Sequence, residues 1–247
     1  MIFSDFETSV TSRIQATGSK INQADQDDAI TQAVKRYSKD RPRELVTDIT
    51  GVNPASAILA LPTGPGNPPE QFEDGFSIIR AIEFPVGNLP PTYLEGEDWL
   101  LYRTPAGLKL ALTSLVPQTT DTLRVTWTLR HNPGTSGQNA IATTVPDSDF
   151  EAVCDLAASF CCDKLSAAYA RTSDSTISAD AVNYRTKAQE YAAIAKQYKK
   201  RYDDHIGIED SGTGAAGANP AAGAISIGNM FETQGSGVDR LTHRRPR

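Results

Sequence analysis

Apolar residues in the N-terminal part of the chain recur with the period of an α-helix. Three of them lie four positions apart: Phe6, Val10 and Ile14. This spacing predicts a short amphipathic helix over residues 4–16 that ends at Gly18. Ser4 and Glu7 have the spacing of a capping box, so we expect them to cap the start of this helix.

A second helical pattern covers residues 23–40. Its apolar stripe consists of Ile30, Ala33, Val34 and Tyr37. Acidic residues lie in its first turns and basic residues in its last turn, which complements the helix dipole at both ends. We expect Pro42 to end the helix, because the residue before a proline is disfavoured in the helical conformation.

Over residues 46–145 the pattern changes to alternation of apolar and polar positions, which is typical of strands. The clearest strand covers residues 123–130, and residues 99–103 and 108–112 form a hairpin around a Pro-Ala-Gly turn. Further strands are predicted at residues 46–50, 57–61, 77–84 and 140–144. In the 77–84 strand we expect Ile78 and Ile82 to share a face.

No helical segment separates these strands, so the pattern indicates an antiparallel sheet and not alternating strands and helices. The connecting residues 62–74 are rich in proline, glycine and acidic residues, and we expect them to form a long exposed loop.

Helical periodicity returns after Pro146, where Ser148 and Glu151 have the spacing of a second capping box. Residues 150–169 carry apolar side chains on most faces, which predicts a largely buried helix. A narrow polar strip follows one face: Glu151, Asp155, Ser159 and Asp163. We expect a break at residues 173–176 and then a long helix over residues 178–204.

Small and aromatic residues alternate in a regular 3-4 spacing along this last helix. The seam consists of Ala181, Tyr184, Ala188, Tyr191, Ala195, Tyr198 and Tyr202. One interpretation is that the seam packs on the preceding helix of its own chain. The other is a contact between subunits, for which tyrosine offers a large rigid face and a polar tip.

Residues 206–247 are rich in glycine and alanine and have too few apolar residues to build a core. They contain one apolar patch and a basic end: Ile225, Ile227, Met230, Phe231, Arg240, Arg244, Arg245 and Arg247. The segment is either a flexible tail or an arm that docks on a partner.

These elements predict an α+β fold, with a helical bundle, an inserted antiparallel β region and an extended C-terminal tail. The boundaries that we expect are residues 1–45 for the first helices, 46–145 for the β region, 146–205 for the later helices and 206–247 for the tail.

Composition narrows the class of protein. The chain of 247 residues has a formal net charge of −6, which argues against a general nucleic-acid binder. Its three cysteines form no disulfide framework and fit a reducing compartment. No apolar run approaches the roughly 20 residues of a membrane span, and the start has no signal-peptide pattern. We therefore expect a soluble, non-secreted protein.

Residues that commonly carry catalysis or bind metals are scattered. His131, His205 and His243 lack ligand spacing, and we expect each to be a surface histidine. Cys154, Cys161 and Cys162 lie on the buried helix, where small buried side chains explain them better than a zinc site or a redox pair.

The acidic group Glu95, Glu97 and Asp98 could supply acid–base catalysis, but a solvated turn before a strand explains it better. Gly64-Pro65-Gly66 lacks the lysine and hydroxyl residue of a phosphate loop. We therefore expect no enzymatic activity, no cofactor and no metal.

Several short stretches resemble one family of structural proteins. They are AVKRYSKDRPRE at residues 33–44, IEFPVG at 82–87, AAY at 167–169 and DSTISAD at 174–180. With Pro90-Pro91, Trp99 and Tyr184-Arg185, this succession over residues 20–205 resembles the head-to-tail connector (adaptor) proteins of tailed bacteriophages.

The resemblance implies a dodecameric ring beneath the portal, at the neck of a virion whose parts are made in the bacterial cytoplasm. The ring would bind the portal on one side and the next neck or tail protein on the other, and genomic DNA would pass through it without specific binding. By the same resemblance, the segment 206–247 would anchor to the portal through Phe231 and the terminal arginines.

Three other functions stay open at this point. The chain could be another neck component, such as a stopper or a tail terminator. It could be a β-rich module that recognises carbohydrate or a host protein through Trp99, Trp127 and the loop 62–74, although both tryptophans fit core positions. It could also be a hydrolase that uses the acidic group at residues 95–98.

Overall fold

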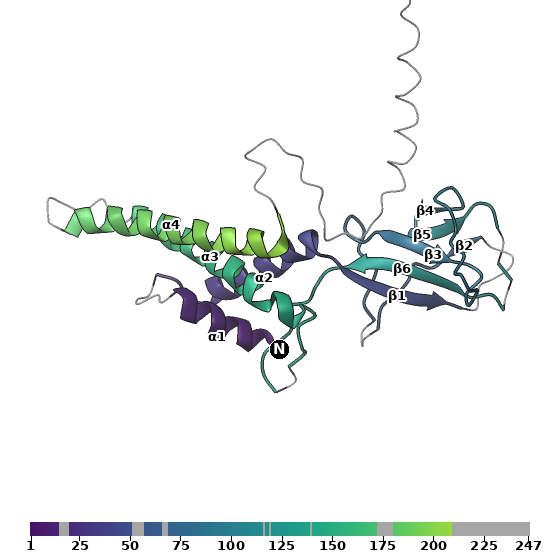
Figure 1. Cartoon of the computed structure of the whole chain (residues 1–247), viewed down its shortest axis with the longest axis horizontal. Coiled ribbons are helices and arrows are strands. Elements are labelled where there is room, and N and C mark those ends of the chain that lie inside the picture. Colours follow the sequence, from purple (N-terminus) through teal and green to yellow (C-terminus); the bar gives the residue numbers. More distant parts are fainter. Residues whose placement is uncertain are drawn as a thin grey trace, which may run out of the picture. The chain divides into compact units, whose positions relative to one another are not determined.

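The computed structural model describes residues 1–14, 20–50, 57–65, 69–115, 117–118, 120–138, 140–171 and 180–208, without the side chains of residues 180–186. This part of the chain holds four helices and two small antiparallel sheets, which confirms the predicted α+β class (Figure 1). The chain divides into two units, Met1–Tyr202 and Asp203–Arg247. The architecture below is that of the first unit, together with the last four residues of the final helix, Asp203–Ile206.

The first helix, α1, covers Phe3–Ile14 and buries the three predicted apolar residues. Its N-terminal cap differs from the prediction. The carboxylate of Asp5 accepts a hydrogen bond from the backbone N–H of Ile2 at 2.8 Å, while Ser4 already lies inside the helix. The predicted capping box of Ser4 and Glu7 is therefore wrong.

The second helix, α2, covers Gln23–Asp40, as the sequence predicts. Asn22 caps it: its side-chain oxygen accepts a hydrogen bond from the backbone N–H of Asp25 at 2.8 Å, and the Asp25 carboxylate accepts one from the N–H of Asn22. The backbone N–H of Arg41 bonds to the carbonyl of Tyr37 at 2.7 Å, just before the proline that ends the helix. The whole predicted apolar stripe of α2 is buried.

The β region consists of two three-stranded antiparallel sheets and not the single sheet that the sequence pattern indicates. The first sheet, in spatial order, holds β1 (Arg43–Ile49), β6 (Leu123–Leu129) and β3 (Ile79–Glu83). The second holds β2 (Ile58–Leu59), β5 (Gly107–Leu112) and β4 (Trp99–Thr104). The predicted hairpin is confirmed as β4 and β5, which pair along their whole length.

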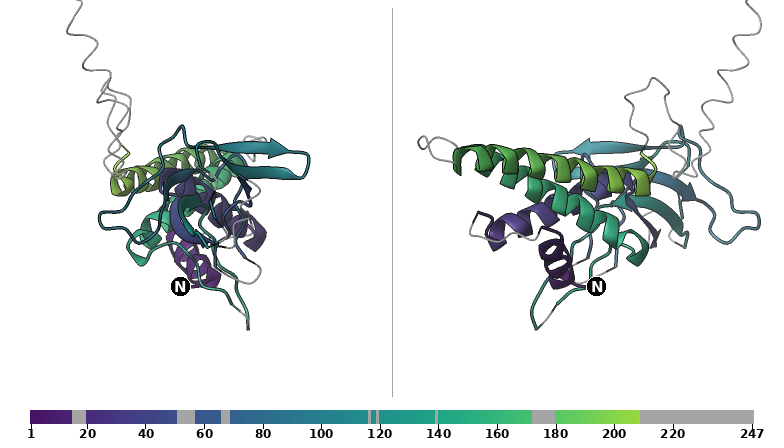
Figure 2. Two further views of the ribbon diagram at one scale, coloured as in Figure 1. Left: turned by 90° about the vertical axis from the view of Figure 1, so that its right-hand side faces the viewer. Right: turned by 60° about the vertical axis from the view of Figure 1, so that its left-hand side comes forward.

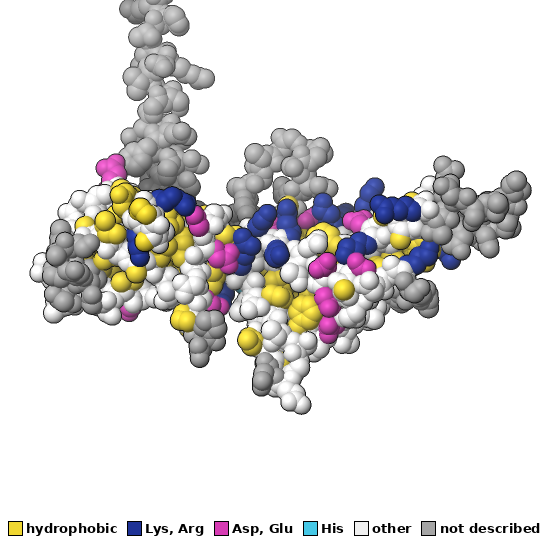
Figure 3. Space-filling view, turned by 180° about the vertical axis from the view of Figure 1, so that it is seen from behind, with side chains coloured by type: hydrophobic (Ala, Val, Ile, Leu, Met, Phe, Trp, Pro, Cys, Tyr) yellow, Lys and Arg dark blue, Asp and Glu magenta, His cyan; other side chains and the backbone are white. Residues whose placement is uncertain are grey.

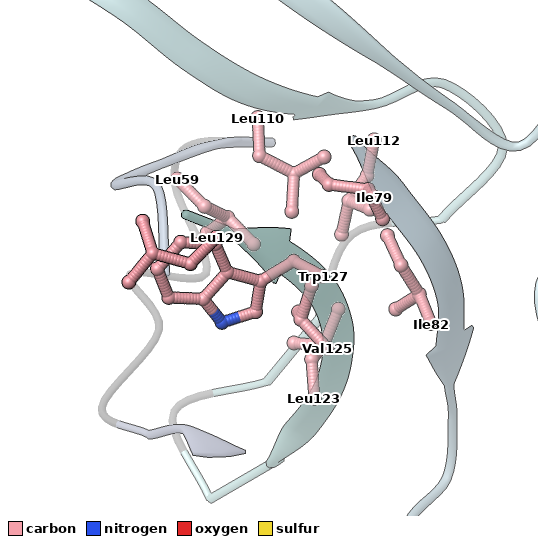
Figure 4. Close-up of a cluster of buried hydrophobic side chains, with 9 residues drawn as sticks. All are labelled: Leu59, Ile79, Ile82, Leu110, Leu112, Leu123, Val125, Trp127 and Leu129. Atoms are coloured by element: carbon pink, nitrogen blue, oxygen red, sulfur yellow. The ribbon is translucent and has the colours of Figure 1, made fainter. Parts of the chain in front are cut away.

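The inner faces of the two sheets share one hydrophobic core around Trp127 (Figure 4). Leu59, Leu110 and Leu112 come from the second sheet, and the other buried residues of this core come from the first. Trp99 packs against the same core. Two sheets form because each strand has one apolar face that must be covered, and the two faces cover each other.

The face that β3 buries differs from the prediction. Ile78 is 57% exposed, whereas Ile79 and Ile82 are buried. The pairing of β3 with β6 shifts between Ile79 and Ala81, which is a β-bulge that changes which side chains point inward. Counting every second residue back from Ile82 therefore places Ile78 on the buried face, although it lies on the exposed one.

Residues 140–144 form no strand, so this prediction is wrong. They are held by single hydrogen bonds, such as those from the N–H of Thr144 to the carbonyl of Asn132 and from the N–H of Thr143 to the carbonyl of Met1. Alternation over five residues is too short to separate a strand from an irregular segment that is fixed by such bonds.

The predicted loop at 62–74 is only partly exposed where it is described. Pro62 and Gly64 are buried, and Thr63 forms an isolated bridge with Gln71. A Cβ atom on Gly64 would lie 2.8 Å from a carboxylate oxygen of Glu70 and 2.9 Å from a methyl group of Leu45, so a larger residue there would displace these side chains. The loop therefore folds back on the β region.

The third helix, α3, covers Asp147–Arg171 and contacts both α1 and α2. Its predicted capping box is wrong, because Glu151 pairs with Arg13 of α1 and the Ser148 hydroxyl donates to Asp149. The predicted polar strip is also interrupted, since Ser159 is buried. The helix is otherwise buried on most faces, as predicted.

The fourth helix, α4, covers Asp180–Ile206 and runs alongside α3 (Figures 1 and 2). The Ser166 hydroxyl of α3 donates a hydrogen bond to the carbonyl of Ala188 at 2.8 Å, which fixes the two helices side by side. Three predicted features lie outside the described residues: the helix end at Gly18, the break at residues 173–176 and the tail after residue 208.

Candidate interaction surface along α4

The acidic group that could have supplied catalysis forms a turn. Asp98 accepts hydrogen bonds from the hydroxyl of Ser114 and from the backbone N–H of Glu95, and both bonds lower the pKa of Asp98, the Ser114 bond more strongly. Glu95 and Glu97 are exposed. The solvated turn that the sequence indicates is confirmed, because the carboxylate of Asp98 accepts the hydrogen bonds that hold the turn together.

The three cysteines are buried free thiols. Burial raises the pKa of Cys154 to about 11, that of Cys161 to about 12 and that of Cys162 to about 11. Thiols of this kind are poor nucleophiles at neutral pH. Among the described residues no group of histidine, cysteine and carboxylate side chains could hold a metal ion.

The histidine prediction is wrong for His131, which is half-buried. Its Nδ1 lies 2.8 Å from the carbonyl of Thr144, its Nε2 lies 3.1 Å from the carbonyl of Arg41, and its ring packs 4.9 Å from that of Tyr37. His131 thus joins the end of α2 to the segment after β6. His205 is exposed as predicted, and His243 lies outside the described residues.

A buried cluster that the sequence did not reveal lies beside this histidine. The carboxylate of Asp149 is 4% exposed and accepts hydrogen bonds from the Tyr37 hydroxyl at 2.6 Å and from Arg41 at 3.0 Å. Burial and the bond to Asp149 raise the pKa of Tyr37. A tyrosine inside an apolar stripe signals that its hydroxyl needs a buried partner, but nothing in the sequence names that partner.

The seam of α4 turns its small residues and Tyr202 toward its own chain. Ala188, Ala195 and Tyr202 are buried, whereas Tyr191 and Tyr198 are half-buried. The side chain of Tyr184 lies outside the described part. In this part of the chain the seam is an intramolecular packing surface with a partly open flank.

Each described tyrosine of the seam has a separate contact. Tyr191 stacks on Tyr169 of α3, with ring centroids 5.4 Å apart and planes 3° from parallel. The Tyr198 hydroxyl donates to the carbonyl of Arg13 at 3.2 Å, and that of Tyr202 donates to Asp40 at 2.7 Å. Burial raises the pKa of all three seam tyrosines.

A groove of about 500 Å³ lies along the open flank of the seam, between α4, the end of α1 and the end of α3. Its lining combines tyrosine rings with charged side chains, among them Arg13, Lys187, Glu190 and Arg201. The Lys20 ammonium lies 4.1 Å from the centre of the Tyr169 ring, and the Arg201 guanidinium lies 5.4 Å from that of Tyr198. The groove is therefore lined partly by tyrosine rings, with cations placed over their faces.

Arg13 fixes the α1 side of the groove. It pairs with Glu151 and, at 2.7 Å, with Asp155, both on α3. Burial opposes its charge, but these two hydrogen bonds outweigh burial and raise its pKa. No sequence pattern points to Arg13, because its partners lie on another helix far along the chain.

Basic residues gather on the exposed surface of α4 (Figure 3). From Lys187 to Arg201 the exposed cations are Lys187, Lys196, Lys199, Lys200 and Arg201, with Glu190 as the only acidic residue of that stretch. This surface is therefore positive although the chain as a whole is acidic. Positive patches of this kind favour acidic partners.

The predicted docking residues of the tail lie outside the described residues. They are Ile225, Ile227, Met230, Phe231, Arg240, Arg244, Arg245 and Arg247. The core positions predicted for the two tryptophans are confirmed, because Trp127 is fully buried and Trp99 packs against the β core. A ligand platform built on Trp127 is thereby excluded.

In the described part of the chain, no helix is both long enough and apolar enough to cross a lipid bilayer. No protein-family model matches the sequence, and a search of curated proteins finds no match.

Proposed function

We propose that this chain is a structural head-to-tail adaptor of a tailed bacteriophage and has no enzymatic activity of its own. It assembles as a ring, with twelve copies by the resemblance, between the portal and the next neck or tail protein. DNA passes through the ring without specific binding. The place of action is the virion neck.

One observation carries this proposal: the order of the elements around an inserted β region. The chain forms α1 and α2, then β1 to β6, then α3 and α4, and α3 returns to pack on both first helices. This is the order that the resemblance to adaptor proteins implies. Two groups considered for catalysis do not favour it: the described buried thiols have raised pKa values, and the acidic group at residues 95–98 forms a turn.

The tail is proposed to dock on the portal, with its apolar patch and terminal arginines as anchors. Arginine pairs with two carboxylate oxygens at once, which suits a site on an acidic partner. Many copies engaging together would make a weak individual contact strong.

The test is to mix the purified chain with the portal protein of the same phage and to examine the complexes by electron microscopy. We expect ring-shaped density with rotational symmetry on one end of the portal. A chain truncated after Ile208 keeps all of α4 and should not dock. A chain with its four terminal arginines replaced by glutamate should also fail, whereas arginine-to-lysine replacements keep the charge and should retain part of the docking.

Two results would contradict the proposal. The first is a portal that shows no added density at saturating concentrations of the wild-type chain. The second is a virion that forms a normal neck when the gene for this chain is deleted.

A further inference from the structure

The outer face of the second sheet is largely apolar although it is exposed, and its one charged residue within β2, β4 and β5 is Lys109, opposite Tyr102. Ile58, Leu100 and Tyr102 are 45%, 43% and 47% exposed. The strand register places them on one face, because Ile58 and Leu100 both pair with Ala111 while Leu59 and Leu101 pair with the buried Leu110. Figure 3 also shows hydrophobic side chains gathered on the surface of the β region.

The outer face of the first sheet is built in the opposite way. It carries ion pairs between Arg124 and Asp48 at 2.8 Å, between Arg124 and Glu83 at 3.4 Å and between Arg80 and Glu44 at 3.8 Å. An antiparallel sheet with one solvated face normally has polar residues there. On the first sheet these charges surround the exposed Val46, whereas the exposed apolar residues of the second sheet have only Lys109 beside them. This difference marks the second sheet as a contact surface.

The strand β4 also lies at the edge of its sheet, at the rim of the β region (Figures 1 and 2). Within the described residues it pairs with β5 alone, so every second residue directs its backbone N–H and carbonyl away from the sheet. Edge strands are commonly protected by proline, a bulge or charged side chains. The strand β4 has no proline and no bulge, and its one charged side chain is that of Arg103, near its end.

We propose that β4 pairs antiparallel with β4 of a second copy of this chain, so that the two second sheets become one continuous sheet. The two-fold axis passes at Leu101, which then lies opposite itself. This register keeps outer-face residues opposite outer-face residues and places Leu100 of one copy opposite Tyr102 of the other. Aromatic and aliphatic side chains opposite each other stabilise antiparallel pairs. The inference goes beyond the proposed function and does not depend on it.

Charge complementarity argues for a second copy as the occupant. Acidic residues precede β4 at Glu95, Glu97 and Asp98, and Arg103 lies near its end. Antiparallel pairing brings Arg103 of each copy beside the acidic start of the other, and the register places no like charges directly opposite each other. Arg103 already pairs with Asp74 in an exposed contact, which leaves the guanidinium open to further acceptors.

The mass of the full-length chain in solution tests the pairing. Sedimentation velocity or light scattering between about 1 and 100 μM, the range of weak to moderate protein association, should show a monomer that converts to a dimer or to larger even assemblies. The double variant Leu100→Lys, Tyr102→Lys should shift this conversion to at least about tenfold higher concentration, because four positive charges then oppose the contact. Val46→Lys is the matched control, since Val46 is an exposed apolar residue on the other sheet, and it should behave as the wild type.

A single cysteine tests the register itself. Leu101→Cys places two thiols opposite each other on the axis, and mild oxidation should give a covalent dimer on a non-reducing gel. Val46→Cys should stay monomeric under the same conditions, and the native cysteines are buried. Circular dichroism at matched concentrations establishes that each variant is folded.

The outcomes separate this inference from the proposed function. A wild-type chain that stays monomeric at 100 μM would overturn the pairing. So would a dimer of the free chain in which folded Leu101→Cys does not cross-link, or a β4 edge that binds only a different protein. If cross-linking succeeds but the portal shows no added density, the pairing stands and the proposed function falls.

Discussion

At the residue scale, the carboxylate of Asp149 determines how the start of α3 is held against the end of α2. It is 4% exposed and is satisfied by the hydroxyl of Tyr37 and the guanidinium of Arg41. A buried carboxylate is tolerated only when it is paired and hydrogen-bonded. The three residues therefore act as one unit, although sequence patterns reveal only the burial of Tyr37.

Removing one member of this unit should be costly. Tyr37→Phe deletes the hydroxyl that donates to Asp149 and leaves the buried carboxylate with one donor fewer. We expect a loss of about 1–3 kcal/mol in the free energy of unfolding, measured by urea denaturation. Tyr93→Phe is the control, because Tyr93 is 57% exposed, and it should change the stability by less than about 0.5 kcal/mol. Equal effects of the two variants would show that the Asp149 bond contributes nothing.

His131 should make the stability depend on pH. Burial lowers its pKa below the ordinary 6.5, outweighing the carbonyls of Thr144 and Arg41, which favour the charged form. The nearby Arg43 also lowers this pKa, and Asp149 raises it. Because the unfolded chain binds the proton more readily, the contribution of His131 is complete above pH 6.5 and is lost as the pH falls through the lowered pKa.

The measurement is the urea midpoint at pH 7.5 and at pH 5.5. The wild type should lose more stability between these two values than His131→Gln does. His205→Gln changes an exposed histidine and should keep the pH dependence of the wild type. A His131→Gln variant with an unchanged slope would contradict the assignment.

At the element scale, the structure confirms the patterns that repeat with one uninterrupted period. The helix α2 and the strand β6 fall where their periodicity places them, because every turn or residue pair faces the same neighbour. The pattern misleads where the backbone changes its register. The bulge of β3 exposes Ile78, and the division of six strands into two sheets depends on contacts between distant residues that no local pattern contains.

The helix caps and the groove show a second reason why some sequence predictions are wrong or incomplete. Ser4 and Ser148 have the spacing of capping residues, but Asp5 accepts the bond from Ile2 at the start of α1, and Glu151 pairs with Arg13. A competing local bond replaces the first motif, and a tertiary contact replaces the second. The flank of α4 was predictable from the positions of its tyrosines, whereas Arg13 enters only through the packing of α1 on α3.

Two tyrosines of the seam should differ in how much they contribute to the stability of the fold. Tyr202→Ala removes a fully buried aromatic ring and its bond to Asp40, and should cost about 3–5 kcal/mol. Tyr191→Ala removes a half-buried ring that stacks on Tyr169, and should cost about 1–3 kcal/mol. Thermal and urea unfolding measure both. A Tyr191→Ala variant with an unmoved thermal midpoint would show that the stack does not hold α4 to α3.

At the scale of the whole molecule, charge is distributed unevenly. The chain carries a net charge of −6, yet the surface of α4 from Lys187 to Arg201 is positive. Arg201, one of the cations of this surface, lies over the Tyr198 ring in the groove. Such asymmetry orients an acidic partner before contact and weakens as salt rises. We therefore expect the affinity of any acidic partner that binds along α4 to fall as the salt concentration rises.

The buried residues of the described chain all precede Gly207, so folding and docking should be separable. We expect truncation after Ile208 to leave the thermal midpoint within about 2 °C of the wild type, because it removes none of those residues. Ile206 is 3% exposed, so truncation before it is the control that should lower the midpoint. If the chain truncated after Ile208 is also destabilised, the tail contributes to the fold. A docking defect of that variant would then no longer identify the tail as the anchor.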